Sequence, residues 1–284
     1  MLMKKIGYID YYIDEWHAHH GFETVKAYNE KTGEDFAIAA VWAETDKADG
    51  LTTEEFCAKY GVKKCATIAE LASEVDYFII LSPDNSEKKL DYAKEAFQYG
   101  KKVFLDKTFA DSYASAVAIY EEAKKTGTKF FSSSSLRYAS ELDAYKDGAQ
   151  SVFVLGSGVT LEDYAVHYLE IIVACMGVGA KQVRFEQRGN QEWAEIEYSD
   201  GRKANFAISM AASYLDFAVY VADKTGDSAF LPIASDFFGN QMADVLRFFK
   251  TGEVSFDSAQ TLELMKIRDG VLKSKAEAGV WVQL

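Results

Sequence analysis

Residues 77–107 read YFIILSPDNSEKKLDYAKEAFQYGKKVFLDK, and this stretch decides how the first half of the chain is interpreted. Its two ends, Tyr77–Leu81 and Lys102–Leu105, are short runs rich in residues that favour β-strands. Between them, Ser86–Tyr99 carries apolar residues three and four positions apart, which is the period of an amphipathic helix. The stretch therefore predicts a strand, a helix and a second strand parallel to the first.

The same alternation extends over residues 4–135. Further strands are predicted at Lys5–Ile9, Ala37–Trp42 and Lys129–Ser132, and further helices at Glu54–Tyr60, Ile68–Glu74 and Ser112–Thr126. Gly61, Gly100 and Gly127 directly follow predicted helices, at the position where a left-handed residue is favoured. Residues 1–135 are therefore predicted to form an α/β domain of the Rossmann type, with a doubly wound parallel sheet. Its ligand should lie at the carboxyl ends of the strands.

The pattern changes after about residue 140, where strands come in succession before the last helices. Strands are predicted at Phe153–Gly158, Lys181–Gln187, Glu192–Tyr198, Lys203–Met210, Leu215–Ala222 and Val280–Leu284, and helices at Asp163–Met176, Ser235–Lys250 and Ser258–Ala278. Asp200-Gly201 is a strong hairpin signal between two of these strands. We therefore expect residues 136–284 to form an α+β domain with a largely antiparallel, open sheet.

The composition narrows the class of function. The chain has 284 residues, and its 44 acidic residues outnumber 31 basic ones, which gives a net charge of −13. This charge repels phosphate backbones and anionic lipid headgroups, so we expect neither nucleic acid nor a membrane as a partner. The sequence shows no apolar run typical of a membrane span or signal peptide, and its three cysteines lack metal-site spacing. We expect a cytoplasmic protein with reduced cysteines that acts on a small molecule.

Three segments carry chemistry at defined places. Ile80–Asn85 (ILSPDN) ends one predicted strand, and Tyr99–Thr108 (YGKKVFLDKT) brings Lys107 to the end of another. Asp163–His167 (DYAVH) puts a carboxylate and an imidazole four positions apart, on one face of a predicted helix. A carboxylate in that position can fix the tautomer of a histidine and raise its basicity, which suits a general base. An ammonium at a strand end can polarise a hydroxyl or carbonyl oxygen.

In this order, the three segments resemble those of the Gfo/Idh/MocA family (glucose-fructose oxidoreductase and inositol dehydrogenase), over essentially the whole chain. The family usually has Thr-Pro-Asn, Gly-Lys-x-Val-x-x-Glu-Lys-Pro and Asp-x-Gly-x-His at these places. The resemblance implies an NAD- or NADP-dependent oxidoreductase acting on a hydroxyl of a sugar, polyol or related small molecule. It implies that His167 is the base, that Lys107 holds the reacting oxygen and that Asp163 orients His167.

The resemblance also implies where a cofactor and a second copy of the chain would bind. The open sheet face formed by residues 181–222 implies a homodimer or a homotetramer. Glu44 or Asp46, after the second predicted strand, is the candidate for the acidic residue that holds the adenosine ribose. The other residues implied to contact the cofactor are Gly7, Ile9, Asp10, Tyr12, Ser82, Pro83 and Asp106.

The first turn departs from the family pattern. A dinucleotide-binding turn needs Gly-x-Gly-x-x-Gly, because only glycine lets the backbone approach the pyrophosphate closely. Here Asp10, Tyr12 and Glu15 stand at the three glycine positions, and their bulk and charge disfavour a bound pyrophosphate. The sequence therefore predicts weak or absent NAD binding. The alternative is a rearranged loop that turns both carboxylates to solvent, with the cofactor held by Ser82 and Pro83.

Further alternatives concern function and local structure. A relative that has lost its cofactor would act as a carbohydrate-binding or regulatory protein, or as a non-redox enzyme in the same cleft. Asp14, His17, His19 and His20 are potential metal ligands, but they lack a recognisable ligand pattern, so we expect a polar helix start and no metal. Ser132–Ser135 is either the crossing between the two domains or a solvated linker.

Overall fold

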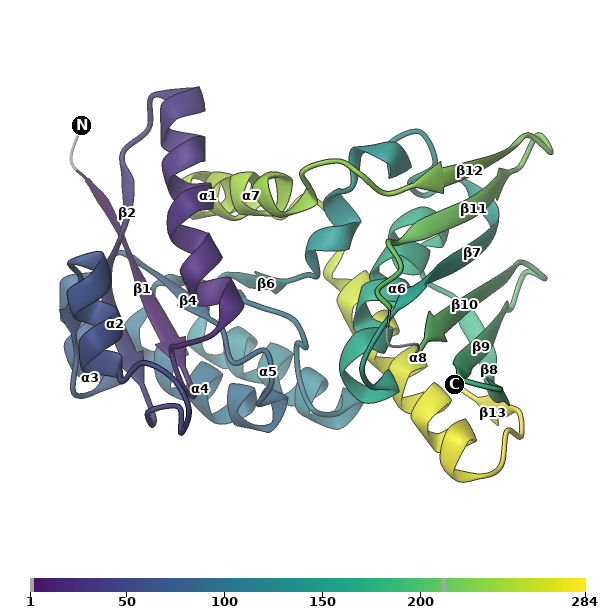
Figure 1. Ribbon diagram of the computed structural model, residues 1–284, viewed down its shortest axis with the longest axis horizontal. Helices are drawn as coiled ribbons and strands as arrows, with labels where there is room; N and C mark the ends of the chain where they lie inside the picture. The colour runs from purple at the N-terminus through teal and green to yellow at the C-terminus, as the bar shows by residue number, and fades with distance from the viewer. Residues whose placement is uncertain (1–2, 211–212) are drawn as a thin grey trace. The chain divides into compact units, whose positions relative to one another are not determined.

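The computed structural model describes residues 3–210 and 213–284, and the chain divides into two compact units (Figure 1). The first unit contains residues 1–133 and 238–255, and the second contains residues 134–237 and 256–284. The predicted boundary between the two domains follows residue 135, and the first observed boundary between the two units follows residue 133. The predicted second domain is continuous, whereas the observed second unit is interrupted by residues 238–255.

A parallel sheet forms the centre of the first unit. Within the described residues its six strands lie in the order β3-β2-β1-β4-β5-β6, and every pairing between them is parallel. This order confirms the predicted doubly wound fold, and it puts the reversal of strand order between β1 and β4. The strands are β1 (Lys4–Asp10), β2 (Phe36–Ala43), β3 (Lys63–Lys64), β4 (Tyr77–Ile80), β5 (Lys102–Leu105) and β6 (Phe130–Ser132).

The helices of the first unit begin and end at residues suited to those positions. Thr52 forms a capping box with Glu55, and Ser112 accepts a hydrogen bond from the first turn of its helix. Gly61, Gly100 and Gly127 have φ between 65° and 70°, as their predicted place after a helix requires. The helices are α1 (Trp16–Thr32), α2 (Thr53–Tyr60), α3 (Ile68–Glu74), α4 (Lys89–Ala96) and α5 (Tyr113–Thr126), with short 3₁₀ turns η1 (Ser86–Lys88) and η2 (Phe97–Tyr99).

Helix α7 (Phe237–Thr251) comes from the second half of the sequence but, from Phe238 onward, belongs to the first unit. Phe249 stacks on Tyr77 with ring centroids 4.6 Å apart, and its carbonyl accepts a hydrogen bond from Lys102 Nζ at 2.5 Å. Phe238 lies against Trp16 of α1, with ring centroids 4.6 Å apart. The amphipathic sequence of α7 predicts that one face is buried, but it does not reveal which unit buries that face.

A largely antiparallel sheet forms the centre of the second unit, as predicted. Within the described residues its seven strands lie in the order β12-β11-β7-β10-β9-β8-β13, and of these pairs β7 and β10 run parallel. The strands are β7 (Ala149–Ser157), β8 (Ala180–Arg188), β9 (Gln191–Tyr198), β10 (Lys203–Ser209), β11 (Ala218–Asp223), β12 (Ser228–Pro232) and β13 (Val282–Gln283). The sequence analysis did not predict β12, and β11 begins three residues after its predicted start.

Helices α6 (Leu161–Met176) and α8 (Ser258–Ala276) pack on each other and on this sheet, and short 3₁₀ turns η3 (Ser135–Tyr138) and η4 (Ser140–Leu142) precede β7. Val219 and Val221 of β11 are fully buried, whereas Tyr220 between them is 42% exposed. Because side chains alternate along a strand, Tyr220 belongs to the opposite face of the sheet. None of the helices within the described ranges is long and apolar enough to cross a bilayer.

Candidate functional site

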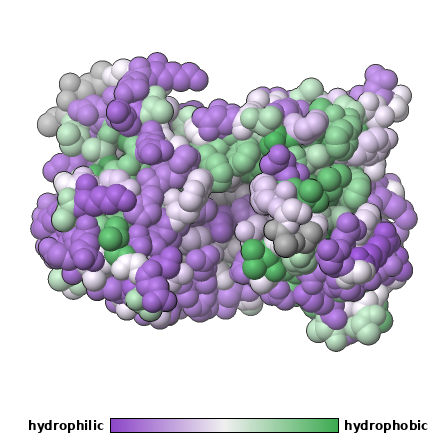
Figure 2. Space-filling view, in the orientation of Figure 1, coloured by the Kyte–Doolittle hydropathy of each residue, from purple (hydrophilic) through white to green (hydrophobic). Residues whose placement is uncertain are grey.

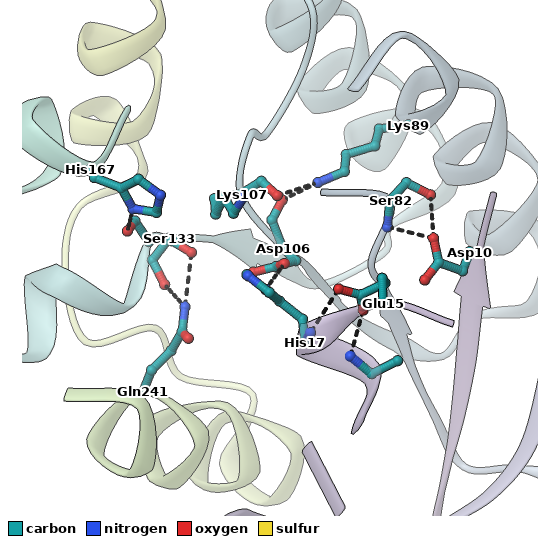
Figure 3. Close-up of polar contacts among 12 residues, drawn as sticks. Asp10, Glu15, His17, Ser82, Lys89, Asp106, Lys107, Ser133, His167 and Gln241 are labelled. Atoms are coloured by element: carbon teal, nitrogen blue, oxygen red, sulfur yellow. Dashed lines mark hydrogen bonds and ion pairs between the residues drawn. The ribbon is translucent and has the colours of Figure 1, made fainter. Parts of the chain in front are cut away.

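Polar side chains gather at the carboxyl ends of β1, β4 and β5 in the first unit (Figure 3). Asp10 is the last residue of β1, Ser82 lies two residues after β4, and Asp106 directly follows β5. All three are almost fully buried. This edge of a doubly wound sheet is where ligands bind, so these residues define the candidate site of the first unit.

Asp10 joins the ends of β1 and β4 across the point where the strand order reverses. Its Oδ1 accepts hydrogen bonds from the backbone N–H of Ser82 at 2.9 Å, from Ser82 Oγ at 3.1 Å and from the backbone N–H of Tyr11 at 2.7 Å. Only 1% of Asp10 is exposed. The loop alternative, in which this carboxylate turns to solvent, is therefore wrong for Asp10.

Glu15 lies at the start of α1 and bonds to the first turn of that helix. Its Oε2 accepts a hydrogen bond from the backbone N–H of His17 at 2.7 Å, and its Oε1 accepts one from the backbone N–H of Ala18. Glu15 is 6% exposed, so its carboxylate is also turned inward rather than to solvent. Two of the backbone donors that the start of a helix presents are thus already bonded within the chain.

Two nitrogen-bearing side chains, His17 and Lys89, flank these carboxylates (Figure 3). His17 Nδ1 lies against the carboxylate of Asp106. Lys89, at the start of α4, is fully buried, and its ammonium donates hydrogen bonds to the backbone carbonyls of Asp106 and Lys107, the latter at 3.0 Å. Lys89 therefore holds the backbone of the segment that carries Lys107, which itself is half-buried.

Lys89 was not predicted as a site residue, although its place in the sequence carries a signal. Tyr92, Ala93 and Ala96, which lie three, four and seven residues later, form the rest of the buried face of α4. A lysine on an otherwise apolar helical face is expected to be buried with hydrogen-bond partners. The spacing of apolar residues in the predicted helix Ser86–Tyr99 could therefore have identified Lys89 as a buried residue.

Burial changes the pKa values of these groups. It raises the pKa of Asp10 and of Glu15, and in Glu15 the neighbouring Asp10 adds to the rise while His17 opposes it. Burial lowers the pKa of the Lys89 ammonium to about 7. At Asp106, burial alone would raise the pKa, but His17 and Lys89 outweigh it and lower the pKa below its usual value. The edge of the sheet thus holds charge-bearing groups that the protein shields from water.

The acidic residues expected to hold an adenosine ribose are also bonded within the chain. Glu44 accepts hydrogen bonds from Lys88 Nζ and from Tyr92 Oη, each at 2.6 Å. Asp46 accepts hydrogen bonds from the backbone N–H and the hydroxyl of Thr53, each at 2.7 Å. Both carboxylates therefore already accept hydrogen bonds from the protein, whereas the prediction has one of them accept hydrogen bonds from a ribose.

Of the remaining predicted cofactor residues, Ile9, Tyr12 and Pro83 lie near the same end of the sheet, and Gly7 lies in the middle of β1. Gly7 and Ile9 are buried within β1, and Pro83 is buried after β4. Tyr12 Oη donates a hydrogen bond to the carboxylate of Asp84 at 3.0 Å. A β-carbon on Gly7 would lie 3.0 Å from side-chain atoms of Leu71 and Val75, so this glycine serves the packing of α3 on β1.

These contacts test whether a nicotinamide dinucleotide fits the site. In a Rossmann-type domain the pyrophosphate binds at the start of the first helix, on backbone N–H groups that face it. In this chain Glu15 accepts hydrogen bonds from two of these groups, and Asp10 closes the crevice between β1 and β4. The residues present do not fit a pyrophosphate in this conformation.

The predicted base lies on α6 of the second unit. His167 Nδ1 is 2.7 Å from Ser134 Oγ. Asp163, in the first turn of α6, is exposed, and its carboxylate accepts a hydrogen bond from Thr160 Oγ1 at 2.7 Å. Thr160 Oγ1 also accepts a hydrogen bond from the backbone N–H of Asp163, so the two residues together begin the helix that carries His167.

Residues 132–135 are buried, so the interpretation of this segment as a solvated linker is wrong. The backbone N–H of Ser134 donates a hydrogen bond to Glu170 Oε2 at 2.9 Å. The other oxygen of Glu170 accepts one from Arg137 Nε, and Arg137 also donates to Gln260 Oε1 at 2.7 Å. This buried ion pair fixes the segment from which Ser134 reaches His167.

The histidines near the start of α1 are engaged with protein groups. His19 Nε2 lies 2.7 Å from Asp14 Oδ1, and its Nδ1 lies 2.6 Å from Tyr60 Oη. His20 stacks on Trp16, with ring centroids 4.5 Å apart. Among residues 3–210 and 213–284, no group of three or more His, Cys, Asp or Glu side chains is placed to hold a metal ion.

Comparisons with known proteins agree with this fold. Residues 7–134 match the model of the Gfo/Idh/MocA family, described as an oxidoreductase family with an NAD-binding Rossmann fold. No curated protein matches the chain.

Solved structures share the fold over nearly the whole chain. A probable dehydrogenase from Thermotoga maritima has 14% identity and a TM-score of 0.80, with 98% of each chain covered. A putative myo-inositol dehydrogenase from Sinorhizobium meliloti has 14% identity and a TM-score of 0.73, with 99% of each chain covered. The WlbA dehydrogenase from Bordetella pertussis, solved with NADH and UDP-GlcNAcA, has 12% identity and a TM-score of 0.75, with 99% of each chain covered.

The raised pKa of Glu15, about 8, predicts a pH dependence of stability. An unfolded chain releases the proton of a glutamate near pH 4.3, roughly its unperturbed pKa. Between these two values the folded state binds more protons than the unfolded state, so the free energy of unfolding falls as the pH rises. We expect the melting temperature to fall from about pH 5 to about pH 8, and to fall less in Glu15→Gln.

Glu30→Gln is the matched control, because Glu30 lies on the same helix, its side chain is 69% exposed and its ion-pair partner is a lysine rather than a histidine. Its melting temperature should follow the wild-type pH dependence. Melting curves of the three proteins in a series of buffers provide the measurement. Equal slopes for Glu15→Gln and wild type would contradict the burial of this carboxyl group.

Proposed function

Residues 7–134 belong to the Gfo/Idh/MocA oxidoreductase family, and from this premise we propose that the protein acts on a hydroxyl group of a sugar, a polyol or a related small molecule. The observation that carries the proposal is the placement of Lys107. This residue lies just after β5, at the edge of the parallel sheet where ligands bind in this fold. The ammonium of Lys89 donates a hydrogen bond to its backbone carbonyl.

The proposed chemistry uses His167 and Lys107. His167 accepts the proton of the substrate hydroxyl, and Lys107 stabilises the oxygen that becomes negative as the proton leaves. The bond between Ser134 Oγ and His167 Nδ1 supports this role, since it fixes the orientation of the ring. Nδ1 then donates its proton to Ser134 Oγ, and the other ring nitrogen, Nε2, is the atom that accepts the proton of the substrate.

We assign Asp163 a positioning role. With Thr160 it begins α6, and its negative charge lies at the end of the helix where a carboxylate is favourable. Asp163 would therefore position His167 indirectly, because it fixes the first turn of the helix that carries His167.

A second candidate function is favoured by Glu15. The family uses a nicotinamide dinucleotide, whereas in this chain the backbone donors for the pyrophosphate are bonded to a carboxylate. A family member whose pyrophosphate donors are occupied in this way would bind a carbohydrate without redox chemistry, or catalyse a reaction at the hydroxyl that needs no nicotinamide. In either case Lys107 and His167 remain the groups that contact the ligand.

The first experiment identifies a ligand and tests these two residues. Wild-type protein is screened against sugars and polyols by thermal shift, because a ligand of the folded state raises the melting temperature. For the best ligand, we expect Lys107→Met and His167→Asn each to weaken binding by about tenfold or more, since each removes a contact to the hydroxyl. Lys124→Met, on the exposed side of α5, is the control. Wild-type affinity in both variants would contradict the proposal.

The same ligand separates the two candidate functions. It is incubated with the protein, with and without added NAD or NADP, and its mass is followed. Loss of two hydrogen atoms that depends on a dinucleotide supports the oxidoreductase. An unchanged mass under both conditions supports the carbohydrate-binding relative, and a change without dinucleotide supports a non-redox enzyme or another acceptor.

We also propose that the protein forms a homodimer or homotetramer through the sheet of the second unit. Phe153 and Trp193 stack with ring centroids 5.2 Å apart, and Phe153 pairs with the exposed Tyr220, which pairs with the exposed Phe230. Figure 2 shows hydrophobic surface over β11 and β12. Aromatic residues that line an exposed sheet face in this way suit a contact with a second copy of the chain. Of the predicted face, residues 211–212 lie outside the described residues.

Light scattering after size exclusion tests this association. We expect a dimer or tetramer at micromolar concentration, and a monomer when Tyr220 and Phe230 are both replaced by Lys, since two charges on the contact would be desolvated. Tyr99→Lys, at a partly exposed tyrosine of the first unit, should keep the wild-type mass. A monomeric wild-type protein would contradict the proposal.

A further inference from the structure

We propose that this chain carries its own ligand for the phosphate position of its dinucleotide fold, and that this ligand is the carboxylate of Glu15. Glu15 then competes with a dinucleotide for the backbone donors at the start of α1, and in the wild-type protein the carboxylate keeps this position. This inference concerns the nucleotide end of the first unit, and it does not depend on which hydroxyl compound the protein takes.

The first step is the geometry at the start of α1. The backbone N–H of His17 and that of Ala18 donate to the two oxygens of one carboxylate, and the backbone N–H of His19 donates to the carbonyl of Glu15 at 3.2 Å. The first two donors, of His17 and Ala18, point out of the helix start, where a bound phosphate would place its oxygens, whereas the bond of His19 is the first i→i−4 bond of the helix. A single residue thus supplies acceptors to three consecutive backbone donors.

The second step is the burial of the carboxylate. Glu15 is 6% exposed, and it lies in the same buried cluster as Asp10 and Asp106, beside the half-buried His17. A phosphate entering beside Glu15 would also face Asp106, which keeps its charge because His17 and Lys89 lower its pKa, and repulsion between like charges is strong where water is excluded. The site therefore disfavours a phosphate both by occupancy and by charge.

Two further carboxylates at expected contact points of a dinucleotide also accept hydrogen bonds from the chain. Asp10 bonds to Ser82 across the crevice between β1 and β4. Glu44, a candidate ribose acceptor, bonds to Lys88 and Tyr92. Three carboxylates of the chain thus take up hydrogen-bond donors along the path that a dinucleotide follows in this fold.

A simple helix cap is the competing interpretation, and a matched pair of substitutions separates the two. Glu15→Ser keeps a good cap, because serine is among the preferred residues there, but its short side chain vacates the phosphate position. Glu15→Gln keeps the length and shape of the side chain in the phosphate position, with one acceptor oxygen left for the two backbone donors. If Glu15 is an internal ligand, the first variant should gain dinucleotide affinity and the second should gain little.

The experiment is calorimetric titration of NADH into the full-length proteins. We expect Glu15→Ser to bind NADH at least tenfold more tightly than wild type, Glu15→Gln to change by less than threefold, and Glu30→Gln to match wild type. A melting temperature is measured for each protein, and Glu15→Gly replaces Glu15→Ser if the latter does not fold.

Two results would overturn the inference. One is a wild-type protein that binds NADH as tightly as Glu15→Ser, and the other is a Glu15→Ser protein that folds and gains no affinity. Neither result bears on the proposed hydroxyl chemistry, which is judged by sugar and polyol binding in Lys107→Met and His167→Asn. Failure of one proposal is therefore distinguishable from failure of the other.

Discussion

The pair of hydrogen bonds from the first turn of α1 to the carboxylate of Glu15 decides how the nucleotide end of this protein is understood. The start of a helix that directly follows the first strand of a Rossmann-type domain has unpaired backbone donors and a partial positive charge. In Rossmann-type domains these features bind a phosphate, whereas this chain satisfies them with a side chain. The buried position of Asp10, its bonds to Ser82 and the raised pKa values of both carboxyl groups are consistent with a site closed from within.

Much of the fold follows from the sequence, because its local signals agree with one another. Short runs of β-forming residues predicted five strands of the parallel sheet, and apolar residues three and four positions apart predicted helices between them. The glycines at positions 61, 100 and 127 marked helix ends. The strands β3 and β12 were missed, since β3 has two residues and β12 has five residues, none of them buried. The assignment of α7 to the first unit depends on contacts such as Phe249 with Tyr77, which join residues far apart in the chain.

The candidate site was predictable in part. The sequence identified Lys107, Asp163 and His167 as candidates, and their roles stay predictions. It also identified Asp10, Tyr12 and Glu15 as replacements for glycine, but residue type alone did not show whether the carboxylates would face solvent or protein. That outcome depends on tertiary contacts, such as the bond from Ser82 to Asp10. Lys89 was missed because a buried lysine is rare enough to be excluded by default, although the apolar face of α4 revealed its place.

A crystal structure of the wild-type protein grown with a saturating concentration of NADH tests the central claim most directly. The account predicts that both oxygens of Glu15 still accept hydrogen bonds from His17 and Ala18, and that no pyrophosphate lies at the start of α1. A pyrophosphate bonded to those two backbone N–H groups, with Glu15 displaced, would contradict it. The protein would then bind its cofactor in the manner of a Rossmann-fold dehydrogenase.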